Sequence, residues 1–501
     1  MSFEWDAIVI GAGIGGLSCA TLLSRNGMKV LVLERHDKVG GYAHQFVRRA
    51  GKDIEYRFDV AHHNTNGLRE GGRFRAIMEE MGVFDKLEIR HLDEVITLKF
   101  PDFEITIPPS VSLFRECLVE LFPKHKDGID KLFATMKSFY EETSAVMEQG
   151  RFDEVARGSL LMEYPTISKY MTASIEEFVA EHVQNPKIAG TICLMSIFLG
   201  AKPKRFSALW YFPWLYEVLD QGLDHIQGGG YAYTLAMRDA IKSYGGEVLT
   251  KTEVERILVE RGKCVGVKTK KGDRFDAPVI VCNAPAPVAF EKLIDSSVVN
   301  PDYLHQALKS EISLSAIKAF LGVKGTPSEI GFEKNDYVVV GSYDLDSEFD
   351  RFIAEDFAGS PFMMSNNTVI NPGDTPEGRT IIQWGTVADG KNWCRLPKET
   401  YKNKKADLTE VIIKRISEVI PDIRDRIEVI EVGTPHTMER YTLNPNGAIS
   451  GYALTSNQRP NLNPRTPVTG LFLAGAWTFP GPGFGGTTMS GANTARIILG
   501  K

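Results

Sequence analysis

The amino-terminal stretch alternates between short apolar runs and glycine-rich or polar segments. Ala7–Ile10 is an apolar run of the kind that forms a buried parallel strand. The positions that follow predict a helix over residues 14–26, and Gly27 stands where a helix often ends in a glycine. A second apolar run at residues 29–33 predicts another buried strand, which Glu34 ends. The order of strand, helix and strand predicts a parallel sheet with a helix packed on it.

Glycines occupy the turn between the first strand and the helix with the spacing GxGxxG. Gly11 allows a sharp turn, Gly13 lets backbone amides approach a pyrophosphate, and Gly16 lets the helix pack closely on the strand. The helix N-terminus directs partial positive charge at the phosphates, and Glu34 stands where an acid binds ribose hydroxyls. A glycine-rich turn without a ligand is the alternative interpretation. The order of all these features favours a dinucleotide site instead.

The chain has 501 residues, which are too many for one ordinary core, so its length predicts two intertwined domains. Further strands, helices and glycine-rich loops are predicted along the rest of the chain. Near the C-terminus, residues 471–474 predict a strand, and the glycines between 481 and 486 predict an open loop. Residues 490–499 predict a helix after that loop. Helical patterns are predicted at 232–244 and across 111–220, and sheet strands at 312–323, 336–343 and 379–387.

Composition narrows the classes of function. The formal net charge of −6 argues against a nucleic-acid-binding protein. The six cysteines form no CxxC pair, which argues against a redox dithiol or a zinc ribbon and favours a reducing, cytoplasmic compartment. His62 and His63 are adjacent and would point apart on a strand, so we expect no metal site there. We also expect neither a signal peptide nor a membrane-spanning helix.

Three further segments resemble a known family. A glycine pair, Gly40 and Gly41, follows Glu34, the sequence FDVAHHNTNG begins at Phe58, and GLFLAGAWTFPGPGFGGTTMSGANTARIIL lies near the C-terminus. With these motifs the chain resembles the FAD-dependent amine oxidase and phytoene desaturase superfamily. Within it, the chain is most similar to the branch that holds retinol saturase and carotenoid cis–trans isomerase. The resemblance implies that FAD is the cofactor.

The resemblance also implies an α/β fold with a discontinuous Rossmann-type FAD-binding domain. A second, α+β substrate domain is expected, built on a mixed sheet and helices. The FAD-binding domain is expected to comprise residues 1–94, 225–311 and 463–501, and the substrate domain residues 95–224 and 312–462.

Cofactor-binding residues are implied by the same motifs. Val254 matches a family valine that contacts adenine through its backbone, and Gly475 with Ala476 stands where the family usually has Gly-Asp. The segment after Gly41 lacks the family's usual arginine, and His44 stands nearby. The residues expected to contact FAD are Gly11, Gly13, Ile14, Gly15, Gly16, Glu34, Arg35, Gly40, Gly41, Val254, Gly475, Ala476, Gly485, Gly486 and Thr487.

The branch implies chemistry at a carbon–carbon double bond of a hydrophobic polyene, such as a carotenoid or a retinoid. The flavin exchanges hydride, while saturation gains a proton, desaturation loses one, and isomerisation needs no net redox change. The candidates for the acid–base group are His63, His62, His44 and Tyr441, and a structural hydrogen bond is the alternative role for the histidines. No second GxGxxG follows a strand, so the electron donor or acceptor stays open.

Two other functions stay open. An FAD-dependent amine oxidase would need an aromatic cage beside the flavin, and usually a lysine near its N5 atom. The candidates for that cage are Trp384, Trp393 and Trp477. A non-enzymatic prenyl-lipid carrier of the GDP-dissociation-inhibitor type shares the fold but lacks FAD, and the intact glycine motif argues against it.

Residues 188–216 combine many aromatic and apolar side chains with a basic run at 202–205. This composition suits a surface that dips into a membrane interface, which would make a cytoplasmic protein peripheral on a membrane. It also suits a buried helix pair that lines a tunnel for a hydrophobic substrate. The buried interpretation is favoured because buried aromatic residues are commoner than membrane anchors.

Overall fold

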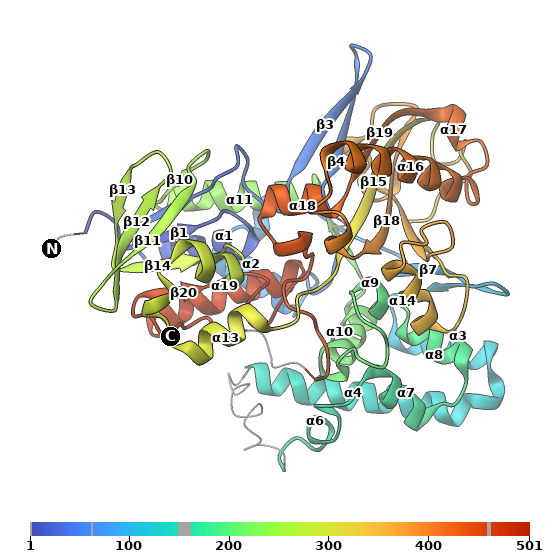
Figure 1. The fold of residues 1–501 in the computed structure, drawn as a ribbon. Helices are drawn as coiled ribbons and strands as arrows, with labels where there is room; N and C mark the ends of the chain where they lie inside the picture. The colour runs from blue at the N-terminus through green and yellow to red at the C-terminus, as the bar shows by residue number, and fades with distance from the viewer. Residues whose placement is uncertain (1–2, 62–63, 149–161, 458–461) are drawn as a thin grey trace.

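The computed structural model describes residues 3–61, 64–148, 162–457 and 462–501. These residues form a parallel sheet, a larger mixed sheet and a helical layer (Figure 1). Within the described ranges, no helix combines the length and the apolar character needed to cross a lipid bilayer.

The parallel sheet has five strands in the order β10-β2-β1-β14-β20. Its strands are β1 (Ala7–Ile10), β2 (Val30–Leu33), β10 (Glu247–Leu249), β14 (Val279–Cys282) and β20 (Leu471–Leu473). Because the strands are parallel, the loops that follow β1, β2, β14 and β20 gather at one edge of the sheet. This is the Rossmann-type arrangement that the sequence predicted.

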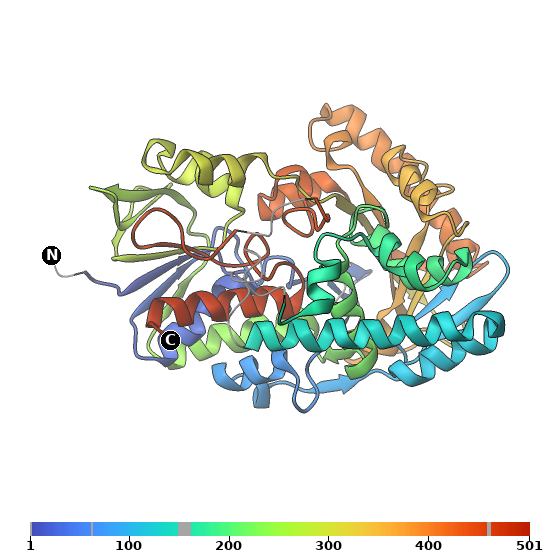
Figure 2. The same cartoon turned by 90° about the horizontal axis from the view of Figure 1, so that it is seen from below.

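Helices cover one face of this sheet and a small antiparallel meander covers the other. The covering elements are α1 (Ile14–Arg25), α11 (Gly229–Ser243), α19 (Phe484–Leu499), β11 (Val254–Glu260), β12 (Lys263–Thr269) and β13 (Arg274–Asp276). In Figures 1 and 2 the red α19 lies against the blue α1, so helices from opposite ends of the chain pack together.

The start of α19 differs from the prediction. The helix begins at Phe484 rather than Ser490, so the last glycines of the predicted open loop lie in its first turn. A side chain at Gly491 would lie 2.2 Å from the carbonyl oxygen of Gly15, so glycine lets α19 approach α1 closely. Packing against α1 therefore overrides the low helix propensity of the glycines.

The larger sheet has seven strands in the order β19-β15-β18-β17-β16-β7-β8, and only the β16–β7 pair is parallel. Its strands are β7 (Ile96–Lys99), β8 (Glu104–Ile107), β15 (Ser315–Lys324), β16 (Asp336–Val339), β17 (Phe362–Asn366), β18 (Arg379–Ala388) and β19 (Ile427–Gly433). One face packs on α16 (Lys398–Ser417) and α17 (Ile423–Arg426). The mixed sheet predicted for the second domain is confirmed.

A hairpin from the N-terminal region, β3 (Gln45–Ala50) and β4 (Ile54–Asp59), packs on the other face of the seven-stranded sheet. Tyr56 and Phe58 of the hairpin contact Phe320 of β15, and Gly322 leaves room for the Tyr56 ring. The hairpin falls in the segment predicted for the FAD-binding domain, while its contacts lie with the other sheet. The predicted division into two domains therefore stays a prediction, although each sheet takes its strands from the segments assigned to it.

The helical layer lies beside the seven-stranded sheet, and the long cyan α4 runs across the front of the molecule in Figure 2. Its helices are α3 (Val111–Leu121), α4 (Lys126–Glu148), α6 (Pro165–Tyr170), α7 (Ile175–His182), α8 (Pro186–Cys193), α9 (Met195–Phe198) and α10 (Ala208–Gln221). The remaining elements are α2 (Arg73–Met81), α12 (Ala286–Val288), α13 (Pro301–Lys309), α14 (Leu345–Ile353), α15 (Asn367–Ile370), α18 (Pro435–Thr442), β5 (Asn64–Thr65), β6 (Ile89–His91) and β9 (Asp224–Ile226).

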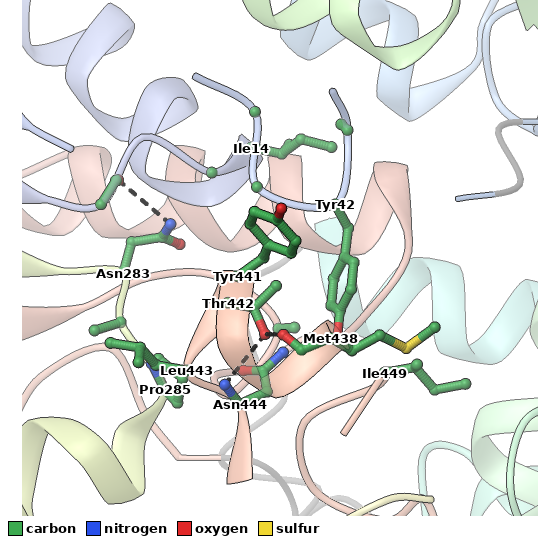
Figure 3. Close-up of a pocket in the computed structure, with 18 of the residues that line it drawn as sticks. Ile14, Tyr42, Asn283, Pro285, Met438, Tyr441, Thr442, Leu443, Asn444 and Ile449 are labelled. Atoms are coloured by element: carbon green, nitrogen blue, oxygen red, sulfur yellow. Dashed lines mark hydrogen bonds between the residues drawn. The ribbon is translucent and has the colours of Figure 1, made fainter. Parts of the chain in front are cut away.

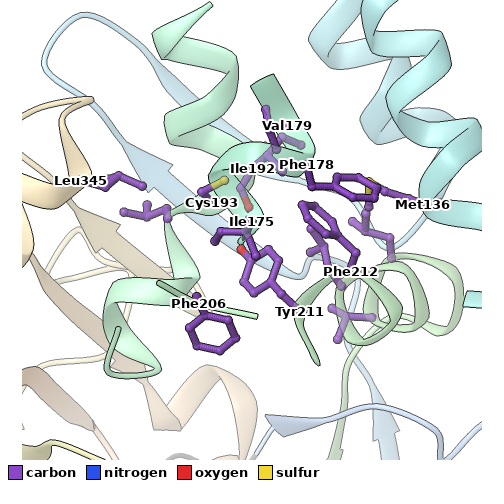
Figure 4. Packing of buried hydrophobic residues seen from close by; sticks show 14 of the residues in the cluster. Met136, Ile175, Phe178, Val179, Ile192, Cys193, Phe206, Tyr211, Phe212 and Leu345 are labelled. Carbon is purple, nitrogen blue, oxygen red and sulfur yellow. Dashed lines mark hydrogen bonds between the residues drawn. The ribbon is translucent and has the colours of Figure 1, made fainter. Parts of the chain in front are cut away.

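The aromatic residues of segment 188–216 lie largely inside this layer. Phe212 stacks on Phe178 with 3.9 Å between ring centroids, and the Tyr211 hydroxyl donates to the carbonyl of Ile192 at 2.6 Å (Figure 4). The basic side chains of the segment form ion pairs with acidic residues of the chain, such as Lys202 with Asp350 at 2.7 Å. The packing agrees with the buried interpretation of this segment.

Candidate functional site

A cavity of about 760 Å³ lies between the carboxyl edge of the parallel sheet and the seven-stranded sheet. Its walls come from the loops after β1, β2, β14 and β20, from α18, and from β15, β17 and β18. The volume falls within the range of sites for small molecules and cofactors. Figure 3 shows side chains of α18 facing the glycine-rich loop across this cavity.

The glycine-rich loop forms one end of the cavity. Gly11 has a φ of +94°, which favours glycine, and a Cβ on Gly16 would lie 2.2 Å from the Gly11 carbonyl oxygen. A Cβ on Gly15 would lie 2.6 Å from the Cα of Gly475, so this loop and the turn after β20 are in close contact. Helix α1 begins after Gly13 without a side-chain cap, which leaves its first amides open to an anion.

Glu34 follows β2 and lines the same end of the cavity. Its buried carboxylate accepts hydrogen bonds from the backbone N–H of Ala12 at 2.8 Å and of His36 at 2.7 Å. A carboxylate has about four acceptor positions, so two stay available for the hydroxyls of a ribose. Arg35 and Val254 also line the cavity here, and the Arg35 guanidinium donates to a backbone carbonyl of α18 at 3.3 Å.

The second glycine pair lies beside the glycine-rich loop. Gly40 and Gly41 have φ values of +118° and +60°, which bend the chain along the cavity wall. His44 follows them, and its Nδ1 lies 2.6 Å from the Gly41 carbonyl oxygen. The His36 ring lies 5.5 Å from the rings of both His44 and Tyr441. His44 and Tyr441 therefore stand at the dinucleotide end of the cavity.

The turn after β20 and the start of α19 complete this end. Gly475 has a φ of +100°, and Gly475, Ala476 and Thr487 line the cavity. Helix α19 begins without a side-chain cap, so a second helix N-terminus meets the cavity with open amides. Gly485 and Gly486 belong to this first turn, but they do not line the cavity.

These features fit FAD. Two uncapped helix N-termini supply donors for negatively charged parts of the cofactor, the Glu34 carboxylate supplies acceptors for ribose hydroxyls, and the glycines let the backbone approach a ligand. The predicted residues that line the cavity are Gly11, Gly13, Ile14, Gly15, Glu34, Arg35, Gly40, Gly41, Val254, Gly475, Ala476 and Thr487. Gly16 packs behind the loop instead, and the catalytic candidates His62 and His63 lie outside the described residues.

Asn283, which follows β14, also lines the cavity and was not singled out in the sequence. Its amide donates to the Gly11 carbonyl at 3.4 Å, and a dashed line in Figure 3 marks this bond. A Cβ on Gly13 would lie 2.8 Å from its Nδ2, and a Cβ on Gly475 would lie 2.3 Å from its Oδ1. Both glycine loops thus close around this one amide. The only available signal was its place directly after a buried strand.

Lys318 was also missed, and it lies in the wall that β15 contributes. Its ammonium donates to Oε1 of Gln383 at 2.7 Å. Burial lowers the pKa of Lys318 to about 8, although the carboxylates of Asp59 and Asp336 pull that pKa upward. A lysine within a strand of alternating pattern usually points to solvent, so the sequence carried no signal for its position.

The other end of the cavity is mainly apolar. The lining side chains there include Phe198, Met363, Val387, Met438 and Ile449, which come from α9, the seven-stranded sheet, α18 and the loop after it. The cavity therefore joins a polar, dinucleotide-like end to an apolar end. A cofactor and a hydrophobic ligand can share it.

Comparisons with known proteins agree with this geometry. A family model described as flavin containing amine oxidoreductase matches residues 14–499. An all-trans-retinol 13,14-reductase from Danio rerio is 25% identical, over 99% of this chain and 86% of its own length. A chloroplastic prolycopene isomerase 1 from an Oncidium hybrid cultivar is 26% identical, over 99% of this chain and 84% of its own length. A solved oxidoreductase from Methanosarcina mazei has a TM-score of 0.65 at 17% identity, over 99% of this chain and 100% of that chain.

The chain belongs to the flavin containing amine oxidoreductase family, because the family model covers nearly all of it. It is an FAD-dependent oxidoreductase, and the predicted cofactor is confirmed. A carrier without FAD is therefore not favoured. The similarity to the retinol reductase and to the prolycopene isomerase agrees with the branch that the sequence motifs indicated.

Proposed function

We propose that this oxidoreductase acts on a carbon–carbon double bond of a hydrophobic, conjugated polyene, by saturation, desaturation or isomerisation. The observation that carries the proposal is the single cavity that runs from the dinucleotide-like loops to the apolar face of the seven-stranded sheet. The names of two relatives, a retinol 13,14-reductase and a prolycopene isomerase, support a polyene as the substrate.

FAD would lie along the polar end of this cavity. The open amides of α1 would hold its phosphates, those of α19 would stabilise negative charge on the reduced flavin ring, and Glu34 would bind a ribose. When bound, FAD supplies hydride exchange. The chain's own contribution is to hold the polyene carbon at the apolar end and to exclude water from it. Catalytic roles for His63, His44 and Tyr441 stay predictions. His44 and Tyr441 lie at the dinucleotide end of the cavity, opposite the apolar end.

An amine oxidase has one feature in its favour, which is Lys318 on the cavity wall. The three tryptophan candidates for an aromatic cage do not come together among the described residues. Trp384 is paired with Ala319, next to Lys318 along β15, so it faces the opposite side of the sheet. Trp393 lies in the same core as Trp384, against α16, and Trp477 lines the cavity without either of them.

An anaerobic absorbance titration tests the proposal. The bound flavin is reduced, all-trans-retinol or a cis-carotenoid is added, and the flavin and polyene bands are followed together. Reoxidation of the flavin with a shortened chromophore indicates saturation, and a shifted polyene with the flavin still reduced indicates isomerisation. Oxidised enzyme mixed with a partly saturated carotenoid tests desaturation. Flavin reduction by primary amines, with no polyene response in any arm, would establish the amine oxidase instead.

The substitution Gly385→Val provides a control within the apolar end. Gly385 lines the cavity on β18, and a Cβ there would meet no atom closer than 3.7 Å, so the strand tolerates it. The added side chain occupies space at the apolar end without contacting the glycine loops. We expect this variant to retain FAD and to lose polyene binding. Equal polyene binding by the variant would place the substrate elsewhere.

Peripheral membrane contact through residues 188–216 also stays a prediction, as does a cytoplasmic location. Tyr211 and Phe212, which would have to insert, are buried, so this segment gives the contact little support. Flotation of the wild-type protein with liposomes tests it. Binding that survives substitution of the partly buried Trp210 and Trp214 by alanine would move the contact to another surface.

A further inference from the structure

Lys318 lies on the cavity-facing side of the seven-stranded sheet, where its cross-strand neighbours have no side chains. It is paired with Gly385 on β18 and with Gly433 on β19. Cross-strand partners point to the same face, so no side chain stands directly opposite Lys318 on either neighbouring strand. A Cβ on Gly385 or Gly433 would meet no atom closer than 3.7 Å, so crowding does not require either glycine. Their effect is to leave open space next to the lysine.

The partners of Lys318 hold its ammonium in place. The Lys318 Nζ donates to Gln383 Oε1 at 2.7 Å, and the Gln383 amide donates to the backbone carbonyl of Asp59 at 3.2 Å. Asp336 on β16 accepts from the Ser365 hydroxyl at 2.6 Å. The lysine thus ends a polar row that crosses the sheet beneath the apolar part of the cavity.

The charges around Lys318 leave it able to gain and to lose a proton near neutral pH. Asp59 from β4 and Asp336 from β16 are the carboxylates that act on it, while β18 contributes the neutral Gln383 and α18 contributes Met438 to the same wall. Burial outweighs the two carboxylates and lowers the pKa of Lys318 to about 8. An acid–base group works best with a pKa near the operating pH.

We propose that Lys318 is the acid–base residue of the double-bond reaction, on the strength of its place at the open, apolar end of the cavity. The inference rests on the proposed function. In saturation the π bond would break, with FAD, when bound in its reduced form, supplying hydride to one carbon and being oxidised in turn. The neighbouring carbon would receive a proton from Lys318 Nζ, and the neutral amine would regain a proton from solvent. In desaturation each transfer runs in reverse, and the amine accepts the proton.

Single-turnover rates measured from pH 6 to pH 10 test this role if the wild type saturates or desaturates the polyene. Isomerisation at a rate that is the same in the wild type and in Lys318→Met would overturn the inference. Saturation should slow as the pH rises through about 8, because the ammonium is lost. Desaturation should accelerate over the same range. Lys318→Met should lower the rate by about 10²–10⁴-fold, which is the usual contribution of a general acid or base. The variant should also lose this dependence of the rate on pH. FAD content and polyene binding should be unchanged.

Two further variants separate proton transfer from a purely structural or electrostatic role. Lys318→Arg keeps the charge but does not release its proton in this pH range, so it should be as slow as Lys318→Met. Asp336→Asn lies away from the cavity lining and removes one carboxylate that raises the pKa of Lys318. The midpoint of the change in rate with pH should therefore move to lower pH in this variant. Full activity of Lys318→Arg would overturn the inference. An unchanged midpoint of the pH dependence in Asp336→Asn would overturn it as well.

A measurement without a polyene keeps this inference distinct from the proposed function. The absorbance of the oxidised, FAD-loaded enzyme is titrated from pH 6 to pH 10, because Lys318 shares the cavity with the cofactor site. A midpoint near 8 that disappears in Lys318→Met supports a proton held on this lysine, even if no polyene reacts. An identical titration in the two proteins counts against the lysine. Failure of the wild type with every polyene counts against the proposed function.

Discussion

Replacing Gly15 with alanine tests whether the cofactor end of the cavity depends on close contact between two backbones. The new Cβ would lie 2.6 Å from the Cα of Gly475 and 2.7 Å from its nitrogen. Carbon atoms normally pack at about 3.5–4.0 Å, so α1 and the turn after β20 must separate by about 1 Å. Such overpacking costs about 1–3 kcal/mol, and the better helix propensity of alanine offsets up to about 1 kcal/mol.

We therefore expect Gly15→Ala to lower the free energy of unfolding of the apoprotein by about 1–2 kcal/mol. FAD affinity should fall about tenfold, the equivalent of about 1.4 kcal/mol, because Gly475 lines the cofactor end. Urea denaturation of the apoprotein measures the first quantity, and titration with FAD followed by flavin fluorescence measures the second.

Gly485→Ala is the matched control, because it makes the same substitution in the first turn of α19. No atom lies within 4 Å of its added Cβ, so stability should be unchanged or slightly higher. If Gly15→Ala matches this control in both its denaturation midpoint and its FAD affinity, the close approach of the two backbones does not matter. The reasoning from the Gly15–Gly475 contact would then be refuted.

Three further outcomes are expected. Glu34→Gln should weaken FAD binding in the same titration, because the carboxylate accepts from two backbone N–H groups and the amide NH₂ would face one of them, Ala12 or His36, at a cost of about 1–3 kcal/mol. Phe212→Ala should cost about 3–5 kcal/mol in urea denaturation and leave FAD affinity unchanged, because this ring lies outside the cavity lining. Burial raises the pKa of Glu217, so the folded state binds that proton more tightly and stability is lost as the pH rises above 4.5 toward the folded pKa. Glu217→Gln, which can still accept from Asn66, should flatten this fall in melting temperature, and an unchanged profile would contradict it.

The sequence predicted the elements whose pattern is local. β1 has the predicted bounds, and α1 ends at Arg25, one residue before the predicted end. The predicted start of α19 was wrong because its first glycines indicate a loop, whereas in the structure they belong to a helix that packs closely on α1 at Gly491. The composition of residues 188–216 fits a membrane surface as well as a core. The core follows from distant partners such as Phe178, which the segment itself does not reveal.

The residues of the site likewise differ in how far the sequence predicts them. Glycine motifs and Glu34 predict the dinucleotide end because one βαβ unit brings them together. Asn283 directly follows β14 and Lys318 lies on β15, and the neighbours of both strands come from other parts of the chain, so the place of these residues in the wall depends on sheet order and register. Lys318 faces open space because its partners on two other strands happen to be Gly385 and Gly433. Neither partner is near it in sequence.

The two ends of the cavity differ in chemistry because different sheets build them. The carboxyl edge of the parallel sheet offers amides and a carboxylate, which suit a dinucleotide, while the seven-stranded sheet offers an apolar face. The β3–β4 hairpin links the two, since Asp59 at the end of β4 acts on Lys318 and also approaches Gly229 of α11. Lys318 and its glycine neighbours lie on strands of the seven-stranded sheet, whereas the glycine loops follow strands of the parallel sheet. Substitutions at Gly15 and at Lys318 therefore test the cofactor end and the apolar end of the cavity separately.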